Sequence, residues 1–266
     1  MPSKKYTHLF FDLDNTIWDF NNNSYNALYL ALEKLDLLVL IGSFESFFRI
    51  YSEENNKLWD LYRQGLMPKK KLIVDRFESS FERNGTPVMV GGAEINEVYL
   101  NEMTNQTKLI HGARKVLDYL HGRYQLAIIT NGFREVQYEK IQKSELSKFF
   151  TKVFISEEIG APKPGRKIFE HAVKSMNAPK KSSLMIGDSW EADILGARNF
   201  GIDQIYFNPG LSNLATKELK FKASVNNFEK NMPIPPSILP PHRGENESKK
   251  INTRIISHLE QLLIIL

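Results

Sequence analysis

The sequence predicts an α/β protein with a doubly wound, Rossmann-like parallel sheet and an inserted bundle of helices. Five short runs are apolar at successive positions, which is typical of parallel strands buried on both faces. Helical patterns separate the last four runs, and strands that alternate with helices indicate βαβ units with right-handed crossovers. The predicted strands span residues 7–13, 124–130, 152–156, 183–187 and 204–208.

Three helices are expected between the last four strands, at residues 133–142, 166–176 and 191–200. The second of them places its apolar residues on one face, as expected for a helix that covers a sheet. Gly201 is a typical helix stop and is expected to end the third. A further core helix, at residues 112–120, leads into the second strand.

More than a hundred residues separate the first two strands, and this interval predicts a helical insertion. A segment of roughly 90 residues is large enough to bury a core of its own. We therefore assign residues 1–17 and 108–266 to the sheet domain and residues 18–107 to a four-helix domain. Asn22, Asn23 and Ser24 are expected to cap the first helix. Turn signals place the four helices up to about residue 37 and at residues 44–64, 69–83 and 93–105.

The C-terminal part of the chain is less regular. Five prolines within residues 233–241 and a charged run at residues 242–250 predict an exposed loop, which we place at residues 231–250. Residues 253–266 are predicted to form a strand followed by a short helix.

The composition is ordinary for a soluble globular protein and excludes several kinds of chemistry. The absence of cysteine excludes disulfides, zinc thiolates and a cysteine nucleophile, and the six histidines lack metal-ligand spacing. The 35 basic and 31 acidic residues give a net charge of +4, and their dispersion argues against a nucleic-acid partner. No stretch approaches ~18 uninterrupted apolar residues, and the first residues do not resemble a signal peptide. We therefore expect no membrane partner and a cytoplasmic location.

Two carboxylates follow the first predicted strand. Asp12 and Asp14 are spaced i, i+2, so a strand directs both side chains to the same side. Like charges placed together are unfavourable unless a cation lies between them, and a hard divalent ion with oxygen ligands is the natural candidate. In isolation, the pair fits a strand followed by an Asp/Asn turn better than an ion site. Matching residues downstream favour the ion.

Two further clusters at predicted strand ends suit an anion. Thr130 and Asn131, followed by Gly132, open a helix whose unpaired backbone N–H groups are able to bind phosphate. Taken alone, this triplet fits a plain helix cap better. Lys163 lies between two prolines that stiffen its backbone, and a fixed ammonium binds phosphate as a point charge. A lone lysine in such a turn is usually just solvated.

The fourth cluster follows the strand at residues 183–187. Gly187 allows a close backbone approach, and Asp188 then completes a magnesium site with Asp12 and Asp14. Asp193, at the start of a helix, has two interpretations. It is an acid favoured by the helix dipole or a residue that orients Asp188 or a water at the ion, and the two roles are compatible.

Taken in order, the motifs D-x-D-x-T, T-N-G, K-P and G-D-x-x-x-x-D resemble the haloacid dehalogenase-like hydrolase superfamily over the sheet domain, up to about residue 208. The resemblance implies that Asp12 is a nucleophile and that Asp14 is a general acid and base. It also implies phosphate ligands at Thr130 and Lys163, and Mg²⁺ held by Asp12, the Asp14 backbone and Asp188. The helical insertion resembles the first type of cap domain in that superfamily.

Four stretches resemble the bacterial pyrimidine-type 5′-nucleotidases of this superfamily, at residues 58–65, 76–78, 129–133 and 155–160. This likeness implies a phosphate monoester hydrolase that acts on nucleoside 5′-monophosphates, with uridine and thymidine types favoured, through an aspartyl-phosphate. The Pro-rich segment departs from the family pattern. Either residues 223–230 or residues 253–263 form the last strand–helix element of the family.

Alternative functions are a phosphatase or phosphomutase acting on sugar phosphates, a 2-haloacid dehalogenase and a non-catalytic regulatory module. A dehalogenase needs the nucleophile but neither a metal nor a second acid, so Asp14 and Asp188 argue against it. We expect a small phosphate ester as substrate and a monomer or homodimer. Trp18, Phe20 and Trp59 are candidates for contact with a base, but packing within the insertion explains them more simply.

Overall fold

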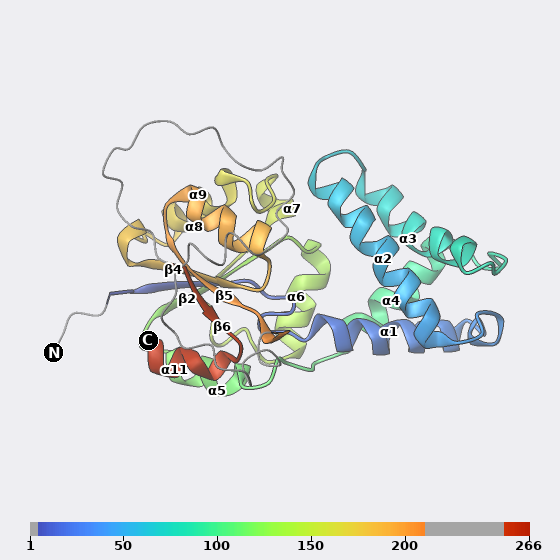
Figure 1. The fold of residues 1–266 in the computed structure, drawn as a ribbon, viewed down its shortest axis with the longest axis horizontal. Coiled ribbons are helices and arrows are strands. Elements are labelled where there is room, and N and C mark those ends of the chain that lie inside the picture. Colours follow the sequence, from blue (N-terminus) through green and yellow to red (C-terminus); the bar gives the residue numbers. More distant parts are fainter. Residues whose placement is uncertain (1–4, 211–252) are drawn as a thin grey trace.

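The computed structural model describes residues 5–210 and 253–266. Its centre is a six-stranded, fully parallel sheet in the order β3-β2-β1-β4-β5-β6 (Figure 1). The five strands expected from the sequence are confirmed, although the first ends at Phe11. The strands are β1 (His8–Phe11), β2 (Gln125–Thr130), β3 (Lys152–Ile155), β4 (Ser183–Gly187), β5 (Asp203–Phe207) and β6 (Thr253–Ile256).

Helices cover both faces of the sheet, which is why its strands are apolar throughout. Leu9 and Phe11 of β1 join one buried cluster, whereas Phe10 joins another on the opposite face. The first cluster includes residues of α5 (Ala113–Leu120), α6 (Arg134–Lys143) and α11 (Leu262–Ile265). The second includes residues of α8 (Arg166–Ser175) and α9 (Gly196–Phe200), which lie across the sheet from α5 and α11 in Figure 1.

The strand order reverses beside β1. The chain builds outward through β2 and β3, and then returns to place β4 on the other side of β1. In such sheets, ligands bind at the carboxyl ends of the strands, in the crevice at this reversal. Residues 253–256 pair with β5, so the second of the two C-terminal candidates lies on the sheet. The other candidate, residues 223–230, and the predicted loop at residues 231–250 lie outside the described residues.

The predicted insertion is a group of four helices beside the sheet (Figure 1). The first packs on the fourth, and the third packs on both the second and the fourth. The chain enters and leaves the group side by side, because Asp19 N donates to Lys108 O (3.0 Å) and Ile110 N donates to Ile17 O (2.9 Å). The helices are α1 (Phe20–Lys34), α2 (Phe44–Arg63), α3 (Lys69–Arg83) and α4 (Gly92–Thr104).

The first helix of the insertion begins earlier than expected. Asp19 caps it by accepting a hydrogen bond from Asn22 N (3.2 Å), so the predicted cap residues, Asn22, Asn23 and Ser24, lie inside the helix. The carboxylate of Asp19 comes first along the chain and satisfies the free N–H group that a cap must bind. The helix ends at Lys34, and Asp36 then adopts a positive φ of 54°.

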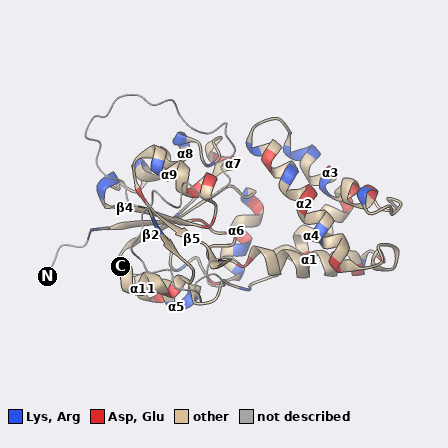
Figure 2. Cartoon of the chain, viewed as in Figure 1, with Lys and Arg blue, Asp and Glu red and all other residues tan. Residues whose placement is uncertain are grey.

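The expected helix at residues 191–200 also differs. It consists of a π-helical stretch, Trp190–Leu195, followed by α9. The remaining short elements are α7 (Ser156–Ile159) and single 3₁₀ turns at Leu38–Leu40, Lys180–Ser182 and Leu259–Gln261. Charged residues of both signs are interspersed along the helices (Figure 2). Among the described residues, no helix combines the length and apolar character needed to cross a membrane.

Candidate active site

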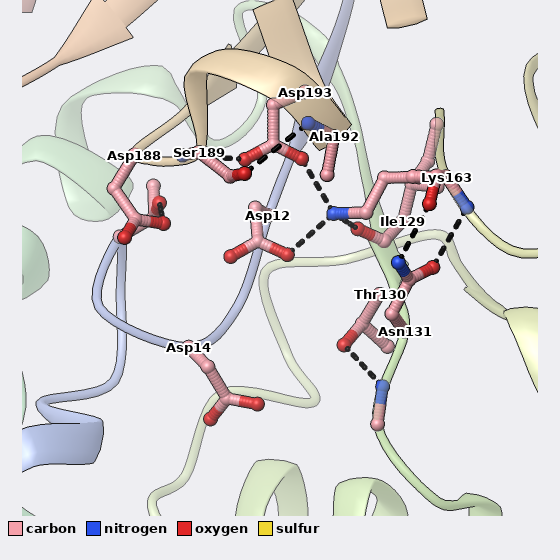
Figure 3. A network of polar contacts seen from close by, with 12 residues as sticks. Asp12, Asp14, Ile129, Thr130, Asn131, Lys163, Asp188, Ser189, Ala192 and Asp193 are labelled. Atoms are coloured by element: carbon pink, nitrogen blue, oxygen red, sulfur yellow. Dashed lines mark hydrogen bonds and ion pairs between the residues drawn. The ribbon is translucent and has the colours of Figure 1, made fainter. Parts of the chain in front are cut away.

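Three strand ends bring the predicted site residues to one edge of the sheet. Asp12 directly follows β1, Thr130 ends β2 and Asp188 directly follows β4. Their side chains point toward a common space, together with those of Lys163 and Asp193 (Figure 3). Because β1 lies between β2 and β4, the reversal of strand order explains why residues so distant in sequence meet here.

Lys163 occupies the centre of this group. It lies between α7 and α8 and is 2% exposed. Its ammonium donates to Asp12 Oδ1 (2.6 Å), to Asp193 Oδ1 (2.6 Å) and to the carbonyl oxygen of Ile129 (2.8 Å). Burial alone would lower the pKa of Lys163, but the charges of Asp12 and Asp193 outweigh it and raise this pKa above its usual range. The side chain is therefore a buried, permanent cation.

Asn131 fixes the backbone of that lysine. Its Oδ1 accepts from Lys163 N (2.8 Å) and its Nδ2 donates to Lys163 O (3.0 Å). The two bonds use both ends of the amide and connect the end of β2 to the Lys163 loop. In this structure the Asn131 side chain thus holds the lysine, and its predicted contact with phosphate stays a prediction.

Asp193 is fully buried and both of its oxygens are bonded. Oδ1 accepts from Lys163, and Oδ2 accepts from the backbone N–H of Ser189 (3.0 Å). Gly187 makes room for it, because a Cβ at this glycine would lie 2.2 Å from Asp193 Oδ2. These contacts show how Asp193 is held, and its predicted role of orienting Asp188 or a water at the ion stays a prediction.

Asp188 is held from the loop after β1, where Thr16 Oγ1 donates to its Oδ1 (3.1 Å). Burial, followed by the charge of Asp193, raises the pKa of Asp188 from 3.8 to about 7. Burial likewise raises the pKa of Asp12 well above its usual range, although Lys163 opposes this effect. The site therefore binds protons more tightly than isolated carboxylates do.

This electrostatic state suits a divalent cation. Carboxylate oxygens of Asp12, Asp188 and Asp193 lie within 4.8 Å of one another. When all three are ionised, Lys163 balances only one of the charges, and the remaining two match those of a hard dication that prefers oxygen ligands. The donor set thus fits Mg²⁺. The sequence predicted Asp12, Asp14 and Asp188 as its ligands, whereas the cluster of carboxylates contains Asp193 in place of the Asp14 side chain, and the ligand set stays a prediction.

Asp14 points away from Asp12 toward α6 (Figure 3). Its Oδ1 accepts from Lys140 Nζ (2.8 Å) and its Oδ2 accepts from Gln137 Nε2 (2.9 Å). Gln137 Nε2 also donates to Thr130 Oγ1 (2.6 Å). Neither Gln137 nor Lys140 was predicted as a site residue. Two polar residues spaced i, i+3 on a helix that must cover the sheet were the available signal, because they share one helix face.

A cavity of about 560 Å³ contains this site and extends to the insertion. Its wall includes Phe20 of α1 and five residues of α2, so the insertion contributes to the space above the carboxylates. Of the aromatic candidates, Phe20 and Trp59 line the cavity, whereas Trp18 is fully buried and its Nε1 donates to Ser144 Oγ (3.1 Å). The α2 residues are Asn55, Asn56, Trp59, Asp60 and Arg63, followed by Gln64 after the helix.

Comparison with known proteins agrees with this geometry. The haloacid dehalogenase-like hydrolase family profile matches residues 6–201. The chain is 32% identical to pyrimidine 5′-nucleotidase YjjG of Escherichia coli over 205 residues, covering 77% of this chain and 87% of that protein. It is also 32% identical to pyrimidine 5′-nucleotidase PynA of Streptococcus pneumoniae over 206 residues, covering 77% and 84%.

A solved structure extends the likeness to nearly the whole chain. The putative HAD-hydrolase YfnB from Bacillus subtilis, in a magnesium-bound form, superposes with a TM-score of 0.77 at 26% identity. The superposition covers 99% of both chains. The similarity therefore includes the helical insertion as well as the sheet.

Proposed function

The chain belongs to the haloacid dehalogenase-like hydrolases, and from this premise we propose that it is a magnesium-dependent phosphate monoester hydrolase, specifically a nucleoside 5′-monophosphate phosphatase. One observation carries the proposal. A carboxylate that is able to act as nucleophile, Asp12, lies 2.6 Å from the buried ammonium of Lys163 and beside Asp188. Nucleophile, fixed cation and ion ligands are the parts that transfer of a phosphoryl group requires.

Asp12 and Asp188 would hold the ion, together with the backbone carbonyl of Asp14. Asp193 is not needed as a ligand, because Lys163 and Ser189 already engage its two oxygens. When bound, Mg²⁺ supplies positive charge that offsets the repulsion between a phosphate ester and the Asp12 carboxylate.

Thr130 and Lys163 bind the phosphate oxygens in this proposal. The hydroxyl oxygen of Thr130 accepts from Gln137 Nε2 (2.6 Å) and Gly132 N (3.3 Å), so its own O–H proton remains available for a phosphate. All three N–H groups of Lys163 are engaged. The N–H group that Lys163 donates to Asp12 is therefore the one that turns to a phosphate oxygen when Asp12 attacks.

The reaction proceeds in two steps. A carboxylate oxygen of Asp12 attacks phosphorus, the bond to the ester oxygen breaks, and protonated Asp14 gives its proton to the departing alcohol. Water then attacks the phosphorus of the aspartyl-phosphate and gives a proton to Asp14. Inorganic phosphate leaves, and the Asp12 carboxylate is restored. Thr130 and Lys163 hold the phosphoryl oxygens through both steps.

The substrate proposal rests on the two nucleotidase relatives and on the cavity. A space of about 560 Å³ falls within the range that small ligands occupy in proteins. We treat residues 18–107 as a cap domain on the sheet domain of residues 1–17 and 108–266, so that α2 faces the alcohol part of the ester. We further propose that the enzyme acts in the cytoplasm as a monomer or homodimer.

A substrate panel tests the proposal. Uridine and thymidine 5′-monophosphates, adenosine 5′-monophosphate, sugar phosphates and p-nitrophenyl phosphate are incubated with Mg²⁺ or with EDTA, and Asp12→Asn is the blank. We expect phosphate release that requires Mg²⁺ and is fastest with nucleotides. Hydrolysis of none of these esters, or an activity that survives EDTA, would contradict the proposal.

A further inference from the structure

A buried arginine lies inside the helical insertion without a carboxylate partner. Arg76 on α3 is 4% exposed, and its guanidinium lies 4.9 Å from the ring centre of Phe77 and 5.0 Å from that of Tyr99. No Asp or Glu among the described residues forms an ion pair with it. Instead, it donates to Oδ1 of Asn55 (3.4 Å) and to Oδ1 of Asn96. Burial of a charge beside neutral partners is costly, so the arrangement invites a functional explanation.

Arg76 determines which way the Asn55 amide faces. A guanidinium only donates hydrogen bonds, so the Asn55 atom directed toward it must be the oxygen. The NH₂ group of Asn55 then points elsewhere. This NH₂ group has no hydrogen-bond partner among the described residues. Its nitrogen is also absent from the unpaired polar atoms that are fully enclosed in the structure. Asn55 also lines the cavity that holds Asp12 and Lys163. An oriented, unpaired amide donor therefore lies at the cavity wall.

The same helix face offers an aromatic surface. Trp59 follows Asn55 at i+4, so both lie on one side of α2, and both line the cavity. Phe133 packs against the Trp59 ring, with 4.7 Å between ring centres. A planar ring bound here would contact an aromatic side chain and an amide donor at once.

We propose that Asn55, held by Arg76, donates a hydrogen bond to a ring carbonyl of the substrate base and thereby selects pyrimidine over adenine nucleotides. Every pyrimidine base carries a carbonyl at C2, whereas adenine carries none. A site built to bond a group discriminates against a ligand that lacks it, because the donor is then left unpaired. The inference rests on the proposed nucleotidase function and assigns Arg76 as a positioning residue.

The test is Asn55→Asp. The carboxylate keeps a contact with Arg76 but has no N–H group to donate, so the melting temperature is expected to hold or rise. The added negative charge at the cavity wall should raise KM for every phosphate ester. We expect kcat/KM for uridine and thymidine 5′-monophosphates to fall about tenfold further than kcat/KM for adenosine 5′-monophosphate and p-nitrophenyl phosphate, which offer no ring carbonyl to Asn55. A purely structural role for Asn55 would leave the uridine-to-adenosine ratio at its wild-type value.

Asn96→Asp is the matched control. It gives Arg76 the same carboxylate but does not alter the cavity wall, so the uridine-to-adenosine ratio should stay as in the wild type. Arg76→Met, which frees the Asn55 amide to rotate, should lower that ratio. An unchanged ratio in Asn55→Asp, or an equal loss in Asn96→Asp, would overturn the inference.

Binding measurements separate this inference from the proposed function. Calorimetric titration of uridine and adenosine 5′-monophosphates with Mg²⁺ into Asp12→Asn, with and without Asn55→Asp, requires no turnover. Hydrolysis of p-nitrophenyl phosphate without preference for the uridine nucleotide would overturn the role of Asn55 and leave the phosphatase intact. Preferential binding of the uridine nucleotide without hydrolysis of any ester would support the role of Asn55 and overturn the proposed phosphatase activity.

Discussion

The ammonium of Lys140 lies 2.8 Å from Oδ1 of Asp14, across 126 residues of sequence. Lys140 is 2% exposed and also lies 4.3 Å from the ring centre of Trp18. Together with Gln137, it holds the carboxylate that we propose as the general acid and base. The orientation of Asp14 thus depends on a helix that the D-x-D motif gives no hint of.

Lys140→Met should lower kcat about tenfold and change KM little, because Asp14 loses one of its two side-chain contacts and turns more freely. Steady-state hydrolysis of p-nitrophenyl phosphate gives both constants. Lys143→Met on the same helix is the control, since that ammonium bonds Asn105 (2.9 Å), away from the site. Equal effects of the two substitutions would argue against a role for Lys140 in positioning Asp14.

Asp12→Asn should keep the fold and lower turnover by several orders of magnitude, because an amide does not act as the nucleophile. Phosphate release measures the loss, and circular dichroism checks the fold. Mass spectrometry of acid-quenched wild-type enzyme should show one added phosphoryl group, and the variant should show none. Near wild-type activity in the variant would rule out the covalent scheme.

Stabilisation by Mg²⁺ should depend on pH through Asp188. Its pKa is about 7, and a proton and a metal ion compete for the same carboxylate. The rise in melting temperature on adding Mg²⁺ should therefore be larger at about pH 8 than at about pH 6. Asp188→Asn should remove most of this rise at both pH values, and a shift that is independent of pH would contradict the assignment.

Without metal, the same group should have the opposite influence on stability. The folded state binds the Asp188 proton more tightly than the unfolded state, whose carboxyl titrates near 3.8. Its contribution to the free energy of unfolding is therefore greatest below that value and declines as pH rises toward about 7. Chemical denaturation in EDTA should show a steeper decline in the wild type than in Asp188→Asn, in which the raised pKa of Asp12 still contributes.

Lys69→Met should raise KM about two- to fivefold and weaken the dependence of KM on salt, because a partly exposed ion pair contributes little and is screened. Lys69 begins α3 and bonds Glu135 on α6 and Glu157 on α7, each at 2.8 Å, so it joins the insertion to the sheet side. Lys71→Met is the control, because Lys71 pairs with Asp75 within α3. Kinetics across a salt series would compare the two.

Gly187→Ala should destabilise the protein by about 1–3 kcal/mol and reduce activity, because the added methyl group displaces Asp193 and with it Lys163. Denaturant unfolding measures the first effect and ester hydrolysis the second. Gly91→Ala is the control, because a Cβ there meets nothing within 4 Å. A Gly187 variant as stable and active as the control would show that the close approach is unimportant.

The residues at strand ends could be found from the sequence because each follows a local pattern. Asp12, Thr130 and Asp188 each stand directly at the end of an apolar run, and parallel strands bring such ends together. The four-helix insertion was equally visible, since turn signals divide it. The domain boundaries and the roles of the site residues stay predictions.

The partners of those residues could not be found in the same way. Gln137 and Lys140 meet the Asp14 carboxylate across more than a hundred positions, and their shared helix face is a local signal that does not name this partner. Thr16 belongs to the D-x-D-x-T motif, but its bond to Asp188 follows only from the fold. Asn131 bonds the backbone of Lys163 through both ends of its amide, and these bonds form only because the Lys163 loop folds toward the end of β2. The choice between two C-terminal segments likewise required the pairing of β6 with β5.

The two backbone connections to the insertion run next to each other and are hydrogen-bonded through Asp19 to Lys108 and Ile17 to Ile110. Two hydrogen-bonded connections form a hinge between the insertion and the sheet domain, because neither segment is able to move along its length without the other. The four helices would thus rotate together about one axis at these connections. The displacement would be small near Trp18 and would grow with distance from it, toward α2 and α3. Opening and closing the entrance to the cavity would then require rotation of a few backbone torsions and the breaking and remaking of the contacts of Lys69 with Glu135 and Glu157 and of Trp59 with Phe133.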